Sequence, residues 1–278
     1  MNNVFLYKFS QKADRLENCP RYSGKKLLVV FAHPDDETFA CGGTIAKYAN
    51  YGVEVALICA TRGEAGEIND SSISKNTPLG EIREQELKHA SKVLGIKTIH
   101  FLGYRDSGMN GSPDNHHPLA LCQADQKEVS KRVGKIIRDF IPDVIITFDP
   151  NGGYGHPDHV AIHQATLTAH KSHEIGKLYY VAFPVSIAKQ IQALHDDEQN
   201  LPTIDIETVA VPDELITNRI DIKPYEKSKR TAALCHRSQI TGDDAFSWAP
   251  EEVRCKLMST EYYLSADSYL NPTGCTWE

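Results

Sequence analysis

The segment KLLVVFAHPDDE, residues 26–37, decides which fold class the chain belongs to. From Lys26 to Ala32 it is a nearly continuous apolar run, which predicts a strand that is buried on both faces. The run leads directly into a turn that contains a histidine, a proline and three acidic residues, and helical spacing follows from Thr38 to Tyr51. A buried strand, a polar turn and a helix in this order form the repeating unit of a parallel α/β sheet.

The same alternation of buried strands and amphipathic helices continues to about residue 183. It predicts an α/β protein with a Rossmann-like, three-layer α/β/α architecture and a mostly parallel, doubly wound sheet. The further elements expected are strands at Val53–Ala60, Lys97–Leu102, Val144–Phe148 and Leu178–Phe183, and helices at Glu81–Leu94, Asp125–Phe140 and about 158–170.

The periodicity becomes less regular after Pro184, which defines the expected domain organisation. Residues 1–24 are expected to form an N-terminal arm and residues 25–278 a single domain, in which residues 184–278 are an appended, irregular C-terminal subdomain. That subdomain has too few buried-looking strands for a core of its own. Its expected elements are a short helix at 186–194, strand-like pieces at 203–211 and 219–222, and a helix at 224–236.

Charge and composition exclude several classes of function. The chain has 278 residues and a formal net charge of −7 without a lysine and arginine cluster, which argues against nucleic-acid binding. No apolar run approaches the roughly 20 residues that cross a bilayer. Seven scattered cysteines without a Cys-x-x-Cys pair, and an N-terminus unlike a signal peptide, favour free thiols in the cytoplasm. The arm and exposed apolar residues leave a homo-oligomer open, although no heptad pattern specifies one.

Two polar clusters, one after each of two strands, predict a metal site. His33 and Asp36 follow the first strand, and the segment DPNGGYGHPDH, residues 149–159, follows the fourth and supplies His159. Because open α/β sheets bind ligands at the carboxyl ends of their strands, these three side chains are expected to converge on one ion. Two histidines and one carboxylate with open coordination positions are typical of catalytic zinc (Zn2+), although Fe2+, Co2+ or Mn2+ fit the same ligands.

The residues beside these ligands are expected to carry out hydrolysis. Asp35 is the expected general base, because a metal lowers the pKa of the water that this carboxylate deprotonates. His156 is expected to face the developing oxyanion as an imidazolium or to protonate a leaving amine, with Asp158 holding its tautomer. Each motif alone also fits an ordinary turn or helix cap, but two such motifs at one sheet edge favour a metal site.

These motifs resemble those of a known family. AHPDDE at 32–37, GGT at 42–44 and GHPDH at 155–159 are similar to the zinc-dependent de-N-acetylases related to the phosphatidylinositol-glycan L (PIG-L) and LmbE proteins. The resemblance covers most of the chain. Further matching segments are TRGEAGE at 61–67, LGYRDSG at 102–108 and CHRSQ at 235–239.

The resemblance implies a role for each matching residue. His33, Asp36 and His159 would bind zinc, Asp35 would be the base, and His156 would stabilise the tetrahedral intermediate. The family typically removes an N-acetyl group from N-acetylglucosamine-type sugars, and some members cleave other amide conjugates. The expected substrate contacts are Arg62, Glu64, Arg105, Asp106 and His236.

A second interpretation of these five residues is that they form surface ion pairs or hydrogen bonds that stabilise loops. Arg83, on the second expected helix, is interpreted as structural and paired with a loop carboxylate. Substrate choice depends on two long irregular stretches, residues 61–80 and 103–122, and on the C-terminal subdomain.

The sequence therefore predicts a zinc-dependent hydrolase that removes the N-acetyl group from an N-acetylglucosamine-type sugar or glycoconjugate and releases an amine and acetate. Two alternatives stay open: a metal-dependent amidase acting on another amide conjugate, and a non-catalytic module that binds a sugar-like ligand. A metal-dependent phosphoesterase is a more distant alternative, because it usually requires more carboxylates and a second metal.

Overall fold

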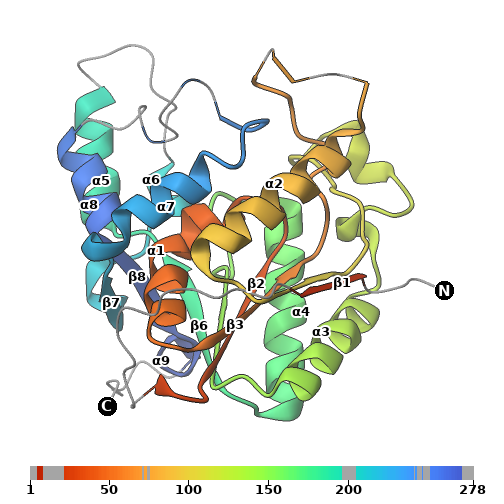
Figure 1. The fold of residues 1–278 in the computed structure, drawn as a ribbon, viewed down its shortest axis with the longest axis horizontal. Coiled ribbons are helices and arrows are strands. Elements are labelled where there is room, and N and C mark those ends of the chain that lie inside the picture. Colours follow the sequence, from red (N-terminus) through yellow and green to blue (C-terminus); the bar gives the residue numbers. More distant parts are fainter. Residues whose placement is uncertain are drawn as a thin grey trace.

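An eight-stranded mixed sheet forms the centre of the protein (Figure 1). The structure is a computed structural model that describes residues 5–8, 22–70, 72–73, 76–195, 205–240, 242, 246 and 251–270. Within these residues the strand order is β1-β4-β3-β2-β5-β6-β8-β7. The strands are β1 (Phe5–Lys8), β2 (Lys26–Phe31), β3 (Glu54–Cys59), β4 (Thr98–Phe101), β5 (Val144–Thr147), β6 (Lys177–Ala182), β7 (Asn218–Asp221) and β8 (Thr260–Ser265).

The five strands β4, β3, β2, β5 and β6 are parallel neighbours in this order and are joined by helices on two faces. α1 (Asp36–Asn50), α2 (Leu79–Leu94) and α7 (Glu226–Ala233) lie on one face, and α3 (Gln126–Phe140) and α4 (Pro157–His173) lie on the other (Figure 1). The expected three-layer fold with a mostly parallel sheet is confirmed. The strand order reverses between β2 and β5, and doubly wound sheets bind their ligands at such a reversal.

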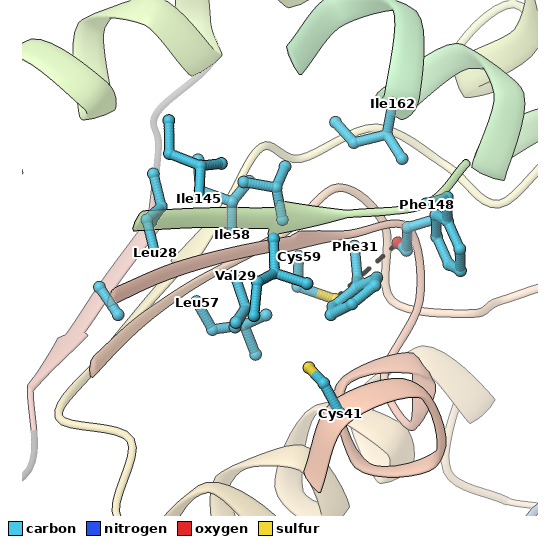
Figure 2. Packing of buried hydrophobic residues seen from close by; sticks show 14 of the residues in the cluster. Leu28, Val29, Phe31, Cys41, Leu57, Ile58, Cys59, Ile145, Phe148 and Ile162 are labelled. Atoms are coloured by element: carbon cyan, nitrogen blue, oxygen red, sulfur yellow. Dashed lines mark hydrogen bonds between the residues drawn. The ribbon is translucent and has the colours of Figure 1, made fainter. Parts of the chain in front are cut away.

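The central strands are buried on both faces because helices cover each side. Figure 2 shows Val29 of β2 on the side of Cys41 of α1, and Ile145 of β5 on the side of Ile162 of α4. All four side chains are inaccessible to solvent. A strand interior of this kind tolerates no unpaired polar side chain, so the polar residues of the sequence collect where the strands end.

The C-terminal part of the chain adds two strands to the same sheet. β8 pairs antiparallel with β6, and β7 pairs antiparallel with β8, so the strand expected at 219–222 is confirmed. The strand-like piece expected at 203–211 is not a strand in its described part, residues 205–211. There Asp205 accepts a hydrogen bond from the amide of Glu207 and begins the short helix α6 (Ile206–Val209). The remaining helices of the described chain are α5 (Val185–His195), α8 (Glu251–Ser259), α9 (Ala266–Leu270) and the 3-10 turns Pro113–His116, Leu121–Gln123, Asp213–Leu215 and Lys223–Tyr225.

A short part of the expected N-terminal arm also joins the sheet. β1 pairs antiparallel with β4, with Phe5 opposite Phe101. This edge pairing was not expected from the sequence, because four residues are too few for a clear alternating pattern. Residues 9–21 of the arm lie outside the described residues.

At a break inside α1, hydrogen bonds hold the C-terminal part of the chain against this helix, which follows the candidate site in the sequence. The backbone leaves the helical conformation at Cys41, and the amides of Gly43 and Thr44 donate to the carboxylate of Glu261 in β8, at 2.9 and 2.7 Å. The ammonium group of Lys229 in α7 lies 2.7 Å from the same carboxylate. These helical amides have lost their usual partners at the break, and a buried carboxylate satisfies them. The middle of α1 is thereby held by residues more than 180 positions away in the chain.

Candidate metal centre

The candidate site lies at the carboxyl ends of β2, β5 and β4. His33 follows β2, Asp158 and His159 lie in the first turn of α4 after the β5 loop, and Asp106 and Ser107 follow β4. All five side chains are buried although they are polar. Buried polar groups cost free energy unless they have partners, so their mutual contacts decide what the site can bind.

Three donor groups face one point in this site. Nδ1 of His33 lies 3.2 Å from Nε2 of His159. The two carboxylate oxygens of Asp36 lie 3.4 Å from these same nitrogens, one oxygen facing each. The structure therefore brings together the three side chains that the sequence singled out as metal ligands.

The donor atoms fit a tetrahedral metal ion. Two nitrogen atoms that bind the same zinc ion at the usual bond length and at the tetrahedral angle lie roughly 3.3 Å apart. Nδ1 of His159 lies 3.1 Å from the carbonyl oxygen of Gly152, and Nε2 of His33 lies 3.1 Å from the carboxylate of Asp158. If these outer nitrogens donate, the facing nitrogens of neutral His33 and His159 both present lone pairs, which repel unless a cation lies between them.

The electrostatics of His33 also favour a cation. Burial lowers the pKa of His33, but hydrogen bonds to three surrounding carboxylates outweigh this effect and raise the pKa well above its usual value. Asp36 stays ionised, because the two neighbouring histidines outweigh the cost of its burial and lower its pKa. Without a metal, a proton on His33 supplies the positive charge that the carboxylates stabilise.

Metal binding is therefore expected to displace this proton from His33. Because the pKa of His33 is raised, the proton is present at neutral pH. At pH values below that pKa, metal affinity increases about tenfold for each unit by which the pH is increased. Calorimetric zinc titrations in buffers of different ionisation enthalpy measure the released proton directly, and chelator competition measures the affinity between pH 6 and 8. An affinity that does not change with pH over this range contradicts the assignment.

A second layer of contacts holds His33 from behind. The carboxylate of Asp158 accepts hydrogen bonds from the amide of Ser107, at 2.9 Å, and from its hydroxyl group. Asp106 lies 3.4 Å from Nε2 of His33, and its other partners are the amides of Ala65 and Gly108. Asp158, expected to contact the ring of His156, thus directs its carboxylate at His33 instead. Such partners orient a ligating imidazole and strengthen its donor nitrogen.

His156 lies at the edge of the same cluster and offers a further donor atom for a metal. The ligand atoms of His33, His156 and His159 lie within 4.8 Å of one another, as do those of His33, Asp106 and Asp158. Nδ1 of His156 accepts the amide hydrogen of Asp158 at 3.1 Å, which leaves the proton of the neutral ring on Nε2. Burial and the two neighbouring histidines lower the pKa of His156 to about 4. This favours a neutral hydrogen-bond donor over the imidazolium considered from the sequence.

Asp35 has an unusual backbone conformation. Its φ angle is +103°, in a region that costs a residue other than glycine about 1–3 kcal/mol. Its carbonyl begins α1, but its side chain makes no capping bond and lies 3.2 Å from the guanidinium of Arg83. Burial raises the pKa of Asp35 to about 6, although Arg83 opposes the shift. A carboxylate with such a pKa is suited to accept a proton near neutral pH.

The residues expected to contact substrate have protein partners in this structure. The guanidinium of Arg62 pairs with Glu84 of α2 and lies over the ring of Phe101. Glu64 accepts hydrogen bonds from the amides of Arg62 and Asp106, at 3.2 and 3.1 Å. Arg105 pairs with Asp114 at 2.7 Å. These contacts hold the loops after β3 and β4 in place around the metal-binding residues.

His236 is separated from solvent altogether. Its side chain has no exposed surface, and its Nε2 lies 3.2 Å from the carboxylate of Glu37, which is equally buried. Sequence reasoning included His236 in the site but assigned no role to Glu37. Glu37 is adjacent to the candidate ligand Asp36 in the AHPDDE motif, and this adjacency was the available signal.

Sequence reasoning also missed Ser107 and Tyr154, whereas its interpretation of Arg83 agrees with the structure. Ser107 supports Asp158, and the ring of Tyr154 meets the ring of His159 edge-on with 5.0 Å between centroids. Arg83 was expected to pair with a loop carboxylate, and that carboxylate is the side chain of Asp35. Ser107 and Tyr154 lie within segments noted from the sequence, but nothing in their spacing indicated a direction.

A cavity of about 300 Å³ is lined in part by Tyr154, whose ring contacts that of His159. Tyr154, in the loop after β5, and Phe39, near the start of α1, form one part of its wall. Residues from the ends of β6 and the C-terminal part, among them Phe183 and Val211, form another. The cavity therefore offers mainly apolar surface beside a strongly polar centre.

The fold and the donor set together define a class, the metal-dependent hydrolases built on a doubly wound α/β sheet. Within that class the chain belongs to the PIG-L family: the family model described as GlcNAc-PI de-N-acetylase matches residues 28–170. The matched region contains all three donor groups, and the resemblance noted from the motifs is confirmed.

Individual relatives agree with this family. A 1D-myo-inositol 2-acetamido-2-deoxy-alpha-D-glucopyranoside deacetylase from Acidothermus cellulolyticus is 39% identical over 273 residues, covering 90% of this chain and 91% of the relative. The solved structure of N,N'-diacetylchitobiose deacetylase from Pyrococcus horikoshii matches with a TM-score of 0.58 and 25% identity, over 88% of this chain and 85% of that chain. A 4-carboxy-2-hydroxymuconate hydratase from Pseudomonas putida has the same TM-score at 18% identity, over 87% of this chain and 96% of that chain. Because that fold neighbour is named as a hydratase, the reaction has to be argued from the site.

Proposed function

We propose that the protein removes the N-acetyl group from an N-acetylglucosamine-type sugar or glycoconjugate by metal-dependent hydrolysis and releases a free amine and acetate. The observation that carries the proposal is the convergence of His33, Asp36 and His159, with donor atoms 3.2–3.4 Å apart, beside the carboxylate of Asp35. The relatives named as deacetylases support the acetamide as the bond that is cleaved.

Zinc is the proposed metal, and Nδ1 of His33, the carboxylate of Asp36 and Nε2 of His159 would hold it. When bound, zinc supplies a Lewis acid that polarises the acetamide carbonyl and lowers the pKa of water. Imidazole and carboxylate ligands also suit iron, cobalt and manganese, so metal availability contributes to the selection.

Two further side chains act on the substrate in this proposal. Asp35 takes a proton from the attacking water and delivers it to the departing nitrogen, so that the carbon–nitrogen bond breaks to give an amine. His156 donates its Nε2 hydrogen to the oxygen that becomes negative as the tetrahedral intermediate forms. Asp158 holds the ring of His33 and, through its amide, the ring of His156.

The cavity beside Tyr154 is the proposed location of the part of the substrate that lies beyond the acetamido sugar. Its volume of about 300 Å³ accommodates a second ring or a similar group. Glu64 and Asp106, on the loops after β3 and β4, are the proposed contacts to sugar hydroxyls, with Arg62 and Arg105 positioning these loops.

Amine release from N-acetylglucosamine and a panel of its conjugates, with elemental analysis of the same protein, tests the proposal. One metal per chain and release of amine and acetate in equal amounts are expected. Metal with release of amine only from non-sugar amides indicates the alternative amidase. Stoichiometric metal without hydrolysis of any acetamide indicates a non-catalytic binding module, which is the other alternative.

The proposed setting of this activity is the cytoplasm. No helix in the described part of the chain is long and apolar enough to span a membrane. The five cysteines reported within the described residues are all free thiols, which is typical of a reducing compartment. We also retain the interpretation of residues 25–278 as one domain, supported by the strands that the C-terminal part adds to the central sheet. A homo-oligomer stays a prediction.

A further inference from the structure

The strained backbone of Asp35 needs an interaction that holds it. A φ angle of +103° at a residue with a side chain persists only when surrounding contacts over-determine it. Arg83 supplies one such contact, because it donates to the carbonyl oxygen of Pro34 at 2.7 Å and also reaches the Asp35 carboxylate. The amide of Asp35 has a different partner. It donates to Oε2 of Glu37 at 3.1 Å, and this bond spans the residue whose conformation is strained.

Glu37 holds this amide with a carboxylate that has no access to solvent. A buried carboxylate keeps its position only if each oxygen has a partner. Its other oxygen, Oε1, accepts from the hydroxyl of Thr38 and lies 3.2 Å from Nε2 of His236. Among the described residues, His236 is the one partner of the Glu37 carboxylate that comes from outside residues 35–38. The position of Glu37 therefore depends on a residue 199 positions further along the chain.

The segment CHRSQ, residues 235–239, carries His236 and is anchored to two other elements. The amide and hydroxyl of Ser238 each donate to the buried carboxylate of Glu86 on α2, both at 2.7 Å. Arg237 pairs with Asp70 in the loop after β3 at 2.7 Å. This segment is therefore held by α2 and by the loop after β3, and it places the imidazole of His236 against Glu37.

We infer that His236 is a positioning residue that acts through Glu37 to hold the backbone of the base Asp35 in its strained, catalytically aligned conformation. The inference rests on the proposed function for the identity of the base. It gives the CHRSQ segment a role that does not involve substrate, because the side chain of His236 has no exposed surface through which a ligand is reached. A misplacement of the base by about 1 Å reduces turnover by about 100-fold.

Kinetics of His236→Ala and His236→Gln test this inference. His236→Ala is expected to lower kcat by about 100-fold while KM changes by less than about threefold and metal content stays at the wild-type value. Glutamine carries an amide nitrogen near the place of Nε2 and again donates to Glu37. The kcat of His236→Gln is therefore expected to be at least about tenfold higher than that of His236→Ala.

Ser238→Ala is the matched control. It removes the hydroxyl bond to Glu86 but keeps the bond that the backbone amide of residue 238 donates to the same carboxylate, so the segment stays anchored and the contact of His236 with Glu37 is retained. Its kcat is expected to stay within about threefold of wild type at temperatures where both variants are folded. An equal loss of kcat in Ser238→Ala and His236→Ala, or a loss that appears only in KM, overturns the inference. So does wild-type kcat in His236→Ala.

Crystal structures of the same proteins give a test that does not depend on activity. In His236→Ala the Asp35 amide is expected to leave Glu37 and φ of Asp35 to return to negative values, whereas Ser238→Ala keeps both. If His236→Ala does not fold, His236→Asn replaces it, because its shorter amide does not reach Glu37 while that of His236→Gln does. If Asp35 keeps its φ angle and its contact with Glu37 in His236→Ala or His236→Asn, the inference is rejected, even if no substrate is hydrolysed. A wild type without activity whose Asp35 responds as expected rejects only the proposed function.

Discussion

Asp35→Asn is expected to reduce kcat for amine release by roughly 10²–10⁴-fold, the usual contribution of a general base. Asparagine has nearly the same shape as aspartate, so the backbone of residue 35 and the contact with Arg83 are retained. It accepts no proton at neutral pH, so the attacking water keeps its hydrogen. The neighbouring donors His33, Asp36 and His159 are unchanged, and one metal per chain is expected to remain.

Steady-state kinetics with elemental analysis of the same preparation measure this effect. The matched control is Asp139→Asn, which alters an exposed carboxylate on α3 that pairs with Lys135. That variant is expected to retain both activity and metal. If Asp35→Asn hydrolyses acetamides as fast as the wild type, Asp35 is not the base. If it loses its metal, the residue contributes to ligand binding instead.

His159→Ala is expected to abolish metal binding and amine release together. The side chain supplies Nε2 to the donor set, and its ring is held in place flat on Phe148 with 3.8 Å between centroids. The metal-free wild type, prepared with a chelator, is expected to be equally inactive and to recover when zinc is added. The variant is expected not to recover at the same zinc concentration.

His163→Gln separates loss of the ligand from general damage to α4. His163 is also a buried histidine, one turn further along the same helix, but its Nδ1 lies 2.8 Å from the carbonyl oxygen of Phe148 and does not face the donor set. Its replacement is expected to cost about 1 kcal/mol of unfolding free energy and to leave metal content unchanged. Metal retained in His159→Ala, or lost equally in both variants as measured by elemental analysis, contradicts the assignment of His159 as a ligand.

The elements that sequence reasoning found correctly share a local cause. The strands around Val29 and Ile145 are continuous apolar runs because helices cover both faces, and such runs are visible without knowledge of the partners. The strands and helices of the C-terminal part were harder to find. β8 contains Glu261, whose burial depends on the amides of Gly43 and Thr44, and these partners lie more than 200 positions away.

The candidate site divides in the same way. The candidate ligands could be predicted because each lies at the end of a buried strand or in the next helical turn, and parallel strands end at one edge. The sequence did not show which partner each of these side chains faces. Asp158 turns to His33, and His236 is enclosed against Glu37, because packing between helices and loops selects those rotamers.

The sequence by itself determined the α/β class and singled out the residues that gather at one edge of the sheet as the candidate ligands and base. Periodicity and motif spacing carry that information within short stretches of chain. Only the tertiary structure decided which carboxylate supports which histidine and what holds Asp35 in a strained conformation. The contacts of Asp158 with His33 and of His236 with Glu37 join residues 125 and 199 positions apart, and their geometry is set by the burial of polar groups that must find partners where water is excluded.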